Sequence, residues 1–183
     1  MDTKSVQAYL NSFGKQVVNR AKSNLGKAKG GSTKLATTIK FEVKPDADGF
    51  VVKFYMADYG TFLDKGVSGN KKKQSYKNYE NQTESSPYRF GTGSSKAGKG
   101  GMSGIMTKWI KKKGFQWKDK ETGKFMSHKS MGFLVARSIY RDGIKSLSFF
   151  QKPLGLGLKQ FGKDLLGAIS TDITDKLSTI KVK

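Results

Sequence analysis

The sequence predicts an α+β fold, in which a small antiparallel sheet is covered by an N-terminal and a C-terminal helix and interrupted by a long basic arm. Apolar residues recur every three or four positions near both ends of the chain, which is typical of amphipathic helices. They alternate with polar residues over 37–56, as in a hairpin, and become scarce over 67–102. The 183 residues, 36% of them hydrophobic, suffice for one domain, with 1–66 and 130–183 as a platform and 67–129 as a basic insertion.

Residues 3–25 are predicted to form an amphipathic helix that buries one face. Gly26 suits its end, because glycine readily adopts the left-handed conformation that closes helices. Residues 27–32, which combine glycine and serine with lysine, indicate a linker. The apolar face of the helix consists of Val6, Leu10, Phe13, Val17, Ala21 and Leu25.

Residues 37–56 are predicted to form a β-hairpin under this helix. Ile39, Phe41 and Val43 share one face of the first strand, and residues 50–56 alternate in the same way. Residues 45–49 supply turn chemistry. The helix and the hairpin each have one apolar face, so we expect each to cover the other.

An aromatic-rich corner follows the hairpin, and the rest of the chain is organised around it. It covers residues 55–66 and reads YMADYGTFLDKG. The regular pattern ends here and a glycine- and lysine-rich excursion begins. We expect the corner to be the hinge between the scaffold that precedes it and the basic excursion that follows it, which would carry the functional contacts.

The excursion over residues 67–102 has few aliphatic residues and many glycines, serines, asparagines and lysines. A loop this long in a compact domain is usually functional or disordered. Its aromatic residues suit stacking on bases or anchoring on a neighbouring protein, and a solvated loop pinned by a few aromatics is the alternative. The candidate contacts to a partner or to nucleic acid, here and in the next basic run, are Lys71, Lys72, Lys73, Tyr76, Tyr79, Lys96, Lys99, Lys111, Lys112 and Lys113.

Regular patterns return after residue 102. Residues 103–113 predict a short helix, 115–126 a hairpin with a glycine turn, and 130–143 another helix. Three lysines at the end of the first of these helices suit its dipole. The apolar face of that helix is predicted to be Ile105, Met106, Trp109 and Ile110.

The last stretch, residues 153–177, has the apolar spacing of a long helix that begins near a proline. Its glycines count against it, because each costs up to about 1 kcal/mol in a helix interior. Either close packing against another backbone compensates for them, or the helix begins only near Leu158. The glycines are Gly155, Gly157, Gly162 and Gly167.

The net charge of +21 predicts a polyanionic partner, either nucleic acid or an acidic protein surface. Between Lys65 and Lys129 there are 16 basic and four acidic residues, so more than half of the excess lies in about a third of the chain. Only four of the 35 basic residues are arginines. Because bidentate reading of base edges favours arginine, we expect non-specific contact rather than sequence readout.

The residue types that most catalytic and cofactor sites require are scarce. The chain has no cysteine and one histidine, His128, and no phosphate-binding glycine motif. Glu42, Asp46 and Asp48 suggest a nuclease-like metal cluster, yet they surround a hairpin turn, where aspartate is expected for turn reasons. We therefore expect a protein that is not an enzyme and has no cofactor or metal. The sequence has no apolar run of 18 residues, so it predicts no membrane span.

The order of these elements resembles the tail-completion, or neck, proteins of tailed bacteriophages. The resemblance rests on an N-terminal helix, a hairpin that ends in the corner, a variable loop, and a late segment, residues 149–154 (FFQKPL), that opens the last helix. Asp64 stands where the family usually has glutamate, and the central insertion is longer than the usual loop. The residues that match the family motif are Tyr59, Phe62, Asp64, Gly66 and Pro153.

This resemblance implies a structural virion protein that is made in the host cytoplasm and forms a ring between head and tail, around the DNA channel. It implies a six- or twelve-fold homo-oligomer in contact with portal, neck and tail proteins, with non-specific contact to genomic DNA allowed. The alternative is an accessory protein that binds nucleic acid without sequence specificity. Steep salt dependence of binding would favour the alternative.

Overall fold

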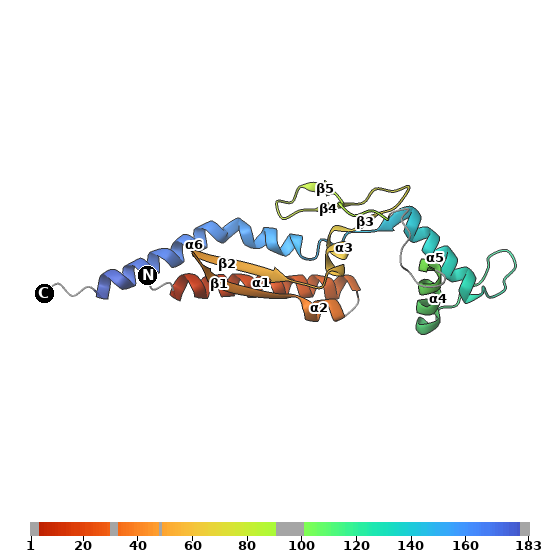
Figure 1. The fold of residues 1–183 in the computed structure, drawn as a ribbon, viewed down its shortest axis with the longest axis horizontal. Coiled ribbons are helices and arrows are strands. Elements are labelled where there is room, and N and C mark those ends of the chain that lie inside the picture. Colours follow the sequence, from red (N-terminus) through yellow and green to blue (C-terminus); the bar gives the residue numbers. More distant parts are fainter. Residues whose placement is uncertain (1–3, 30–32, 48, 91–100, 180–183) are drawn as a thin grey trace. The chain divides into compact units, whose positions relative to one another are not determined.

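The computed structural model describes residues 4–29, 33–47, 49–90 and 101–179 of the chain (Figure 1). It confirms the predicted α+β class, with small antiparallel sheets and helices near both ends. The helices are α1 (Lys4–Lys29), α2 (Lys34–Thr38), α3 (Tyr59–Lys65), α4 (Gly101–Lys113), α5 (His128–Asp142) and α6 (Gln151–Thr179). The strands are β1 (Lys40–Asp46), β2 (Gly49–Tyr55), β3 (Val67–Ser68), β4 (Ser75–Lys77), β5 (Thr83–Ser85) and β6 (Gly143–Ile144).

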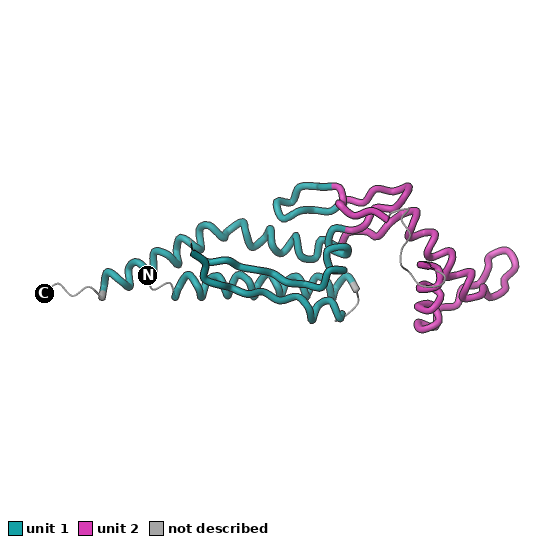
Figure 2. The backbone as a smooth tube through the Cα atoms, in the orientation of Figure 1, with its two compact units in different colours: residues 1–65, 76–84, 147–183 teal, residues 66–75, 85–146 magenta. Residues whose placement is uncertain are grey.

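The chain divides into two compact units (Figure 2). Unit 1 comprises residues 1–65, 76–84 and 147–183, and unit 2 comprises residues 66–75 and 85–146. These boundaries differ from the predicted insertion over 67–129. The tip of the β4–β5 hairpin belongs to unit 1, and α5 belongs to unit 2.

Unit 1 is built from α1, the β1–β2 hairpin and α6, which lie along one another (Figure 1). Strands β1 and β2 pair antiparallel, with Phe41 opposite Phe54 and Val43 opposite Val52. Helices α1 and α6 run in opposite directions. The start of α1 contacts Asp172 near the end of α6, and Tyr9, further along α1, packs against Phe161 nearer the start of α6. The predicted face of α1 is confirmed, since all six of its apolar residues are buried.

The N-terminus of α1 is capped by a side chain from the other end of the sequence. The Asp172 carboxylate accepts the backbone N–H groups of Ser5 and Val6, with N···O distances of 2.9 and 3.1 Å. The first N–H groups of a helix have no partner within it, so an external carboxylate satisfies them and complements the helix dipole. Burial raises the pKa of Asp172, but these hydrogen bonds outweigh it and leave the pKa below its ordinary value. Asp172 thereby joins the two terminal helices.

Helix α6 begins at Gln151, so its glycines do not delay it. Close packing explains two of them. A Cβ on Gly155 would overlap the carbonyl oxygen of Tyr79, and a Cβ on Gly157 would lie 2.7 Å from the Phe13 ring. Gly162 and Gly167 have nothing within 4 Å of a Cβ. The first alternative from the sequence is therefore confirmed for the first half of the helix, where the β4–β5 hairpin and α1 approach it.

We expect Gly155→Ala to destabilise unit 1 by about 1–3 kcal/mol, because the added methyl group would push the hairpin backbone away from α6. Gly162→Ala on the same helix is the matched control. It meets open space and should instead stabilise the protein by up to about 1 kcal/mol. Urea denaturation followed by helical circular dichroism measures both. Equal effects of the two substitutions would show that the hairpin does not rest on Gly155.

Residues 67–90 contain strands that the sequence analysis did not predict. Strand β3 pairs antiparallel with β6, and β4 pairs with β5. Close backbone approach makes the first pairing feasible, because a Cβ on Gly69 would overlap the backbone of Arg141. The β3–β6 contacts join residues about 75 positions apart, so no local pattern indicates that pairing.

Unit 2 contains α4 and α5, which pack against each other. They approach closely at Gly132, where a Cβ would overlap the Thr107 hydroxyl. Ile110 and Met131 are fully buried. The predicted buried face of α4 is wrong in part, because Ile105 and Trp109 are 52% and 44% exposed. A single partner helix covers only a narrow stripe of α4.

Candidate functional site

The corner and the late segment meet at Asp64. This carboxylate lies at the end of α3 and is 2% exposed. It accepts the backbone N–H of Phe150 at 2.8 Å and hydrogen bonds from Gln151, at the start of α6. The Asp64 carbonyl oxygen also accepts the N–H of Ser148, at 3.0 Å. Residues 86 positions apart thus form one structural element, with an acidic side chain at the positive end of a long helix.

Burial raises the pKa of the Asp64 carboxyl above its ordinary value of 3.8. The hydrogen bonds from Phe150 and Gln151, and the nearby Lys65 charge, oppose this rise but do not cancel it. A carboxylate removed from water needs such donors, because its charged form is costly in a low-dielectric environment. The contact is therefore a cap in which the acceptor oxygen satisfies N–H groups, while burial disfavours the negative charge.

The other residues of the family motif occupy different environments. Pro153 lies buried in the first turn of α6, where its missing N–H is not needed. Gly66 has φ +74°, and a Cβ there would lie 2.8 Å from the Ile144 carbonyl oxygen, so only glycine fits. Tyr59 and Phe62 are 47% and 41% exposed. The motif thus combines a cap and backbone requirements with two aromatic side chains on the surface of α3.

No family model, curated protein or solved structure matches the chain. The likeness of the corner and the late segment to the phage neck family therefore remains a prediction. The contact between Asp64 and Phe150 joins the two segments on which the resemblance rests.

The predicted lysine contacts are exposed where the structure describes them. Lys71, Lys72 and Lys73 follow β3, and the basic run 111–113 ends α4. Lys96 and Lys99 lie outside the described residues. Counted from the sequence, unit 2 has 17 lysines and arginines against three acidic residues, a net charge of +14 out of +21. The basic character predicted for the middle of the chain is thus concentrated in one unit.

The two predicted aromatic contacts differ. Tyr76 is 7% exposed, and its hydroxyl donates to the Glu84 carboxylate. Lys65 also lies over the Tyr76 ring, with its Nζ 5.4 Å from the centroid. Tyr76 is thus a structural residue of the β4–β5 hairpin, and little of its side chain is accessible to a partner. Tyr79 lies at the tip of the hairpin and is 47% exposed.

A hydrogen-bond network fixes the tip of this hairpin. Glu84 accepts from Asn78 at 2.6 Å as well as from Tyr76, and these two bonds hold the pKa of Glu84 below its usual value. The Asn78 side-chain oxygen accepts the backbone N–H groups of Glu80 and Gln82. The tip is therefore held in one conformation beside α6.

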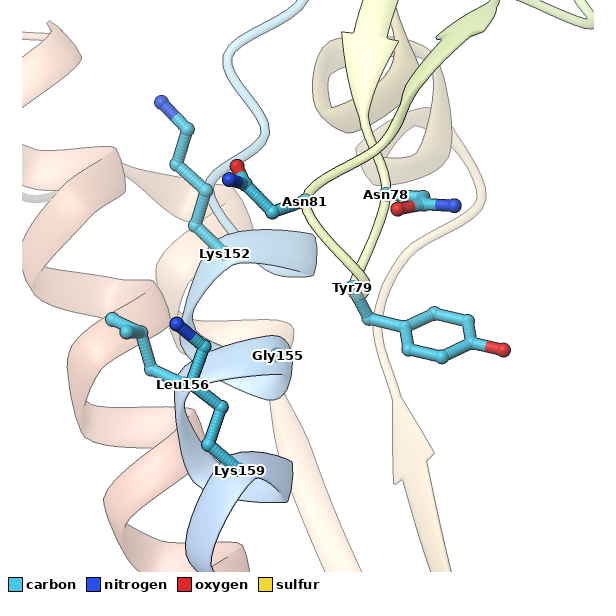
Figure 3. A pocket seen from close by; sticks show the side chains of 7 residues that line it. All are labelled: Asn78, Tyr79, Asn81, Lys152, Gly155, Leu156 and Lys159. Carbon is cyan, nitrogen blue, oxygen red and sulfur yellow. The ribbon is translucent and has the colours of Figure 1, made fainter.

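A pocket of about 240 Å³ lies between the hairpin tip and α6 (Figure 3). Lys152, Leu156 and Lys159 line it from α6, and Asn81 lines it from the hairpin. The Tyr79 ring points away from α6 (Figure 3). Two cations and an amide around an apolar floor suit a small anionic group on an apolar stem.

A group of exposed aromatic residues in unit 2 was not predicted from the sequence. Trp109 was assigned to a buried helix face, and the rings of the 115–126 hairpin were assigned no role. The structure exposes Phe115, Trp117 and Phe125 by 43%, 41% and 65%. One sequence feature could have indicated this exposure. The rings alternate with lysines, so few apolar neighbours are available to bury them.

The described residues contain no cluster of three or more histidine, aspartate or glutamate side chains that could hold a metal ion. Asp48, one member of the acidic group considered from the sequence, lies outside the described residues. None of the described helices is both long enough and apolar enough to cross a membrane.

Proposed function

We propose that the chain is a structural virion protein of a tailed bacteriophage and forms a ring in the head-to-tail neck, around the DNA channel. The observation that carries the proposal is the hydrogen bond between Asp64 and Phe150. It unites the corner and the late segment, the two parts of the chain that resemble the neck family, at the start of α6. Because this contact fixes the start of α6 against the corner, it suits a ring subunit in which α6 must keep one orientation relative to the corner.

The division into two units also supports an assembly role. Unit 1 has its own hydrophobic core of α1, α2, β-hairpin and α6 residues, including the fully buried Phe149, Leu25 and Leu35. Unit 2 is a strongly basic segment inserted between its parts. A self-contained platform with an inserted second unit suits head-to-tail contact between subunits, and such contact closes into rings when the rotation permits. Unit 2 would then grip an adjacent subunit or an acidic neck or portal surface.

The first test is a pull-down of the tagged full-length protein from cells that express it with its neighbouring genes. The extract is treated with nuclease, and the bound proteins are identified by mass spectrometry. We expect portal, neck or tail proteins to stay bound. Loss of all such partners on nuclease treatment would contradict the neck assignment.

A shortened variant tests the role of unit 2 in assembly. The Phe90 and Tyr140 rings lie 5.6 Å apart, so a short Gly-Ser linker can replace residues 91–139. This removes α4, the 115–126 hairpin and most of α5, and keeps β3, β6 and the β4–β5 hairpin. We expect a folded unit 1, with helical circular dichroism, that is absent from particles. Incorporation of the shortened variant at the wild-type level would contradict an assembly role of unit 2.

A further inference from the structure

Unit 2 displays several exposed aromatic side chains, and we term four of them, Trp109, Phe115, Trp117 and Phe125, the aromatic surface. Each is between 41% and 65% exposed. They come from the end of α4 and from the adjoining 115–126 hairpin. Contiguous exposed apolar patches mark interaction sites, whereas single apolar residues scattered over a surface are normal.

These rings are held in place. Trp109 and Phe115 pack together, with centroids 5.3 Å apart and planes inclined by 52°. The hairpin is closed by hydrogen bonds from the N–H of Asp119 to the carbonyl oxygen of Lys124, at 2.9 Å, and from the N–H of Met126 to that of Trp117, at 2.8 Å. Rings that are already ordered lose little conformational entropy when a partner binds.

The lysines around the aromatic surface keep an uncompensated charge. Within the described part of unit 2, the one ion pair joins Arg141 to its neighbour Asp142. The Asp119 carboxylate accepts the backbone N–H groups of Glu121 and Thr122, so it serves its own turn. Lys118 lies over the Phe125 ring, with its Nζ 5.1 Å from the centroid. The surface therefore offers π faces and ammonium groups side by side.

We propose that the aromatic surface binds single-stranded nucleic acid, with bases stacked on the rings and phosphates on the lysines of α4 and the hairpin. A single strand presents a flat π face and a negative charge at every nucleotide, which matches this alternation. In a duplex the base faces are covered by their neighbours, so a duplex would satisfy the lysines and leave the rings exposed. An acidic protein segment would likewise satisfy the charges alone. This activity goes beyond the neck role and does not rest on it.

The chain offers a direct reporter of this contact. Its only two tryptophans, Trp109 and Trp117, both belong to the aromatic surface. Stacking of a base on either ring should quench its fluorescence. The full-length protein is titrated with oligo-dT and oligo-U of about 12 nucleotides, with a DNA duplex of equal length, and with polyglutamate. We expect saturable quenching by both single strands, and little quenching by the duplex or by polyglutamate.

Substitution of one ring tests stacking apart from charge. Trp109→Phe leaves Trp117 as the sole reporter, and should keep both binding and quenching. Trp117→Ala should weaken oligo-dT binding about tenfold or more, whereas Trp117→Phe should restore most of it. Affinity in this series is measured with a fluorescently labelled oligonucleotide, so that loss of the reporter ring does not hide binding. Unchanged affinity in Trp117→Ala would overturn the proposal.

A second variant tests the lysines. In this variant, glutamine replaces Lys111, Lys112 and Lys113 together. The slope of log affinity against log salt should become shallower by about 2, because each phosphate contact on a single strand contributes about 0.7. The matched control replaces the exposed Lys15, Lys27 and Lys40 of unit 1 and changes the net charge equally. It should leave the slope nearly unchanged. Equal slopes in the two variants would show that only the total charge matters, and would overturn the proposal.

Two other results of the titrations would also overturn the proposal. Quenching by polyglutamate as strong as that by oligo-dT would assign the surface to an acidic protein. Tighter binding of the duplex than of either single strand would reject base stacking. Neither outcome bears on the pull-down, since phage partners that survive nuclease would support the neck role whether or not the aromatic surface binds a strand.

Discussion

Replacing Asp64 with alanine is expected to lower the free energy of unfolding of unit 1 by about 2–3 kcal/mol, because it leaves buried N–H groups at the start of α6 without an acceptor. Under the proposed neck role, the same substitution should also reduce the retention of portal, neck or tail proteins, since it frees the late segment from the corner. Chemical denaturation followed by helical circular dichroism measures the first effect. The pull-down described above measures the second.

Asp64→Asn is the control that separates the acceptor from the charge. Its side-chain oxygen can still accept the Phe150 N–H, and the burial cost of a charge is absent. We expect Asp64→Asn to stay within about 1 kcal/mol of the wild type at neutral pH. A loss as large as that of Asp64→Ala would show that the negative charge, rather than the hydrogen bond, holds α6.

The raised pKa of Asp64 predicts the direction of a pH effect. Between that raised pKa and the ordinary value of 3.8, the folded protein binds more protons at this site than the unfolded chain does. The wild type should therefore gain stability relative to Asp64→Asn as the pH falls through this window. The difference between the two proteins isolates Asp64 from Asp172, whose lowered pKa acts in the opposite direction. A wild type that loses stability relative to Asp64→Asn on acidification would contradict the raised pKa.

Replacing Ile110 with alanine is expected to destabilise unit 2 by about 2–5 kcal/mol, the largest stability effect that we predict. Ile110 is fully buried in a unit with few buried apolar side chains, so the cavity has little chance to be refilled. Such a loss is a large fraction of the roughly 5–15 kcal/mol by which native domains are stable. Unit 2 should then unfold at a lower denaturant concentration than unit 1.

Tryptophan fluorescence follows this step, because both tryptophans lie in unit 2, while circular dichroism also reports the helices of unit 1. Ile105→Ala is the matched control on the same helix, since Ile105 is 52% exposed. It should change the midpoint little. If Ile105→Ala proved as costly as Ile110→Ala, the packing of α4 on α5 would be different from that described. Loss of unit 2 should also abolish quenching by oligo-dT.

Local pattern was enough for much of the fold. The spacing of Val6, Leu10 and Phe13 predicted which face of α1 is buried, and the turn chemistry at residues 45–49 predicted a hairpin there. The helices α4 and α5 were predicted to within about two residues. These features depend on neighbours in the sequence, for which periodicity and turn chemistry are sufficient.

The candidate sites were predicted less well, because the exposure of a side chain depends on the residues that pack over it in the folded protein. Trp109 has the spacing of a buried residue, yet α5 covers only the stripe of α4 that contains Ile110. Tyr76 lies in a polar, lysine-rich stretch and is nevertheless buried, with its hydroxyl donating to the Glu84 carboxylate. Neither result follows from composition.

By itself, the sequence determined the α+β class, the amphipathic first helix, the hairpin and the concentration of positive charge in the middle of the chain. Only the tertiary structure decided that Asp64 caps α6, that Asp172 caps α1 and that Gly155 lies against the hairpin backbone. Each of these contacts joins residues more than 70 positions apart. Their energy comes from satisfying buried N–H groups and filling space, which depends on three-dimensional proximity and leaves no periodic trace in the chain.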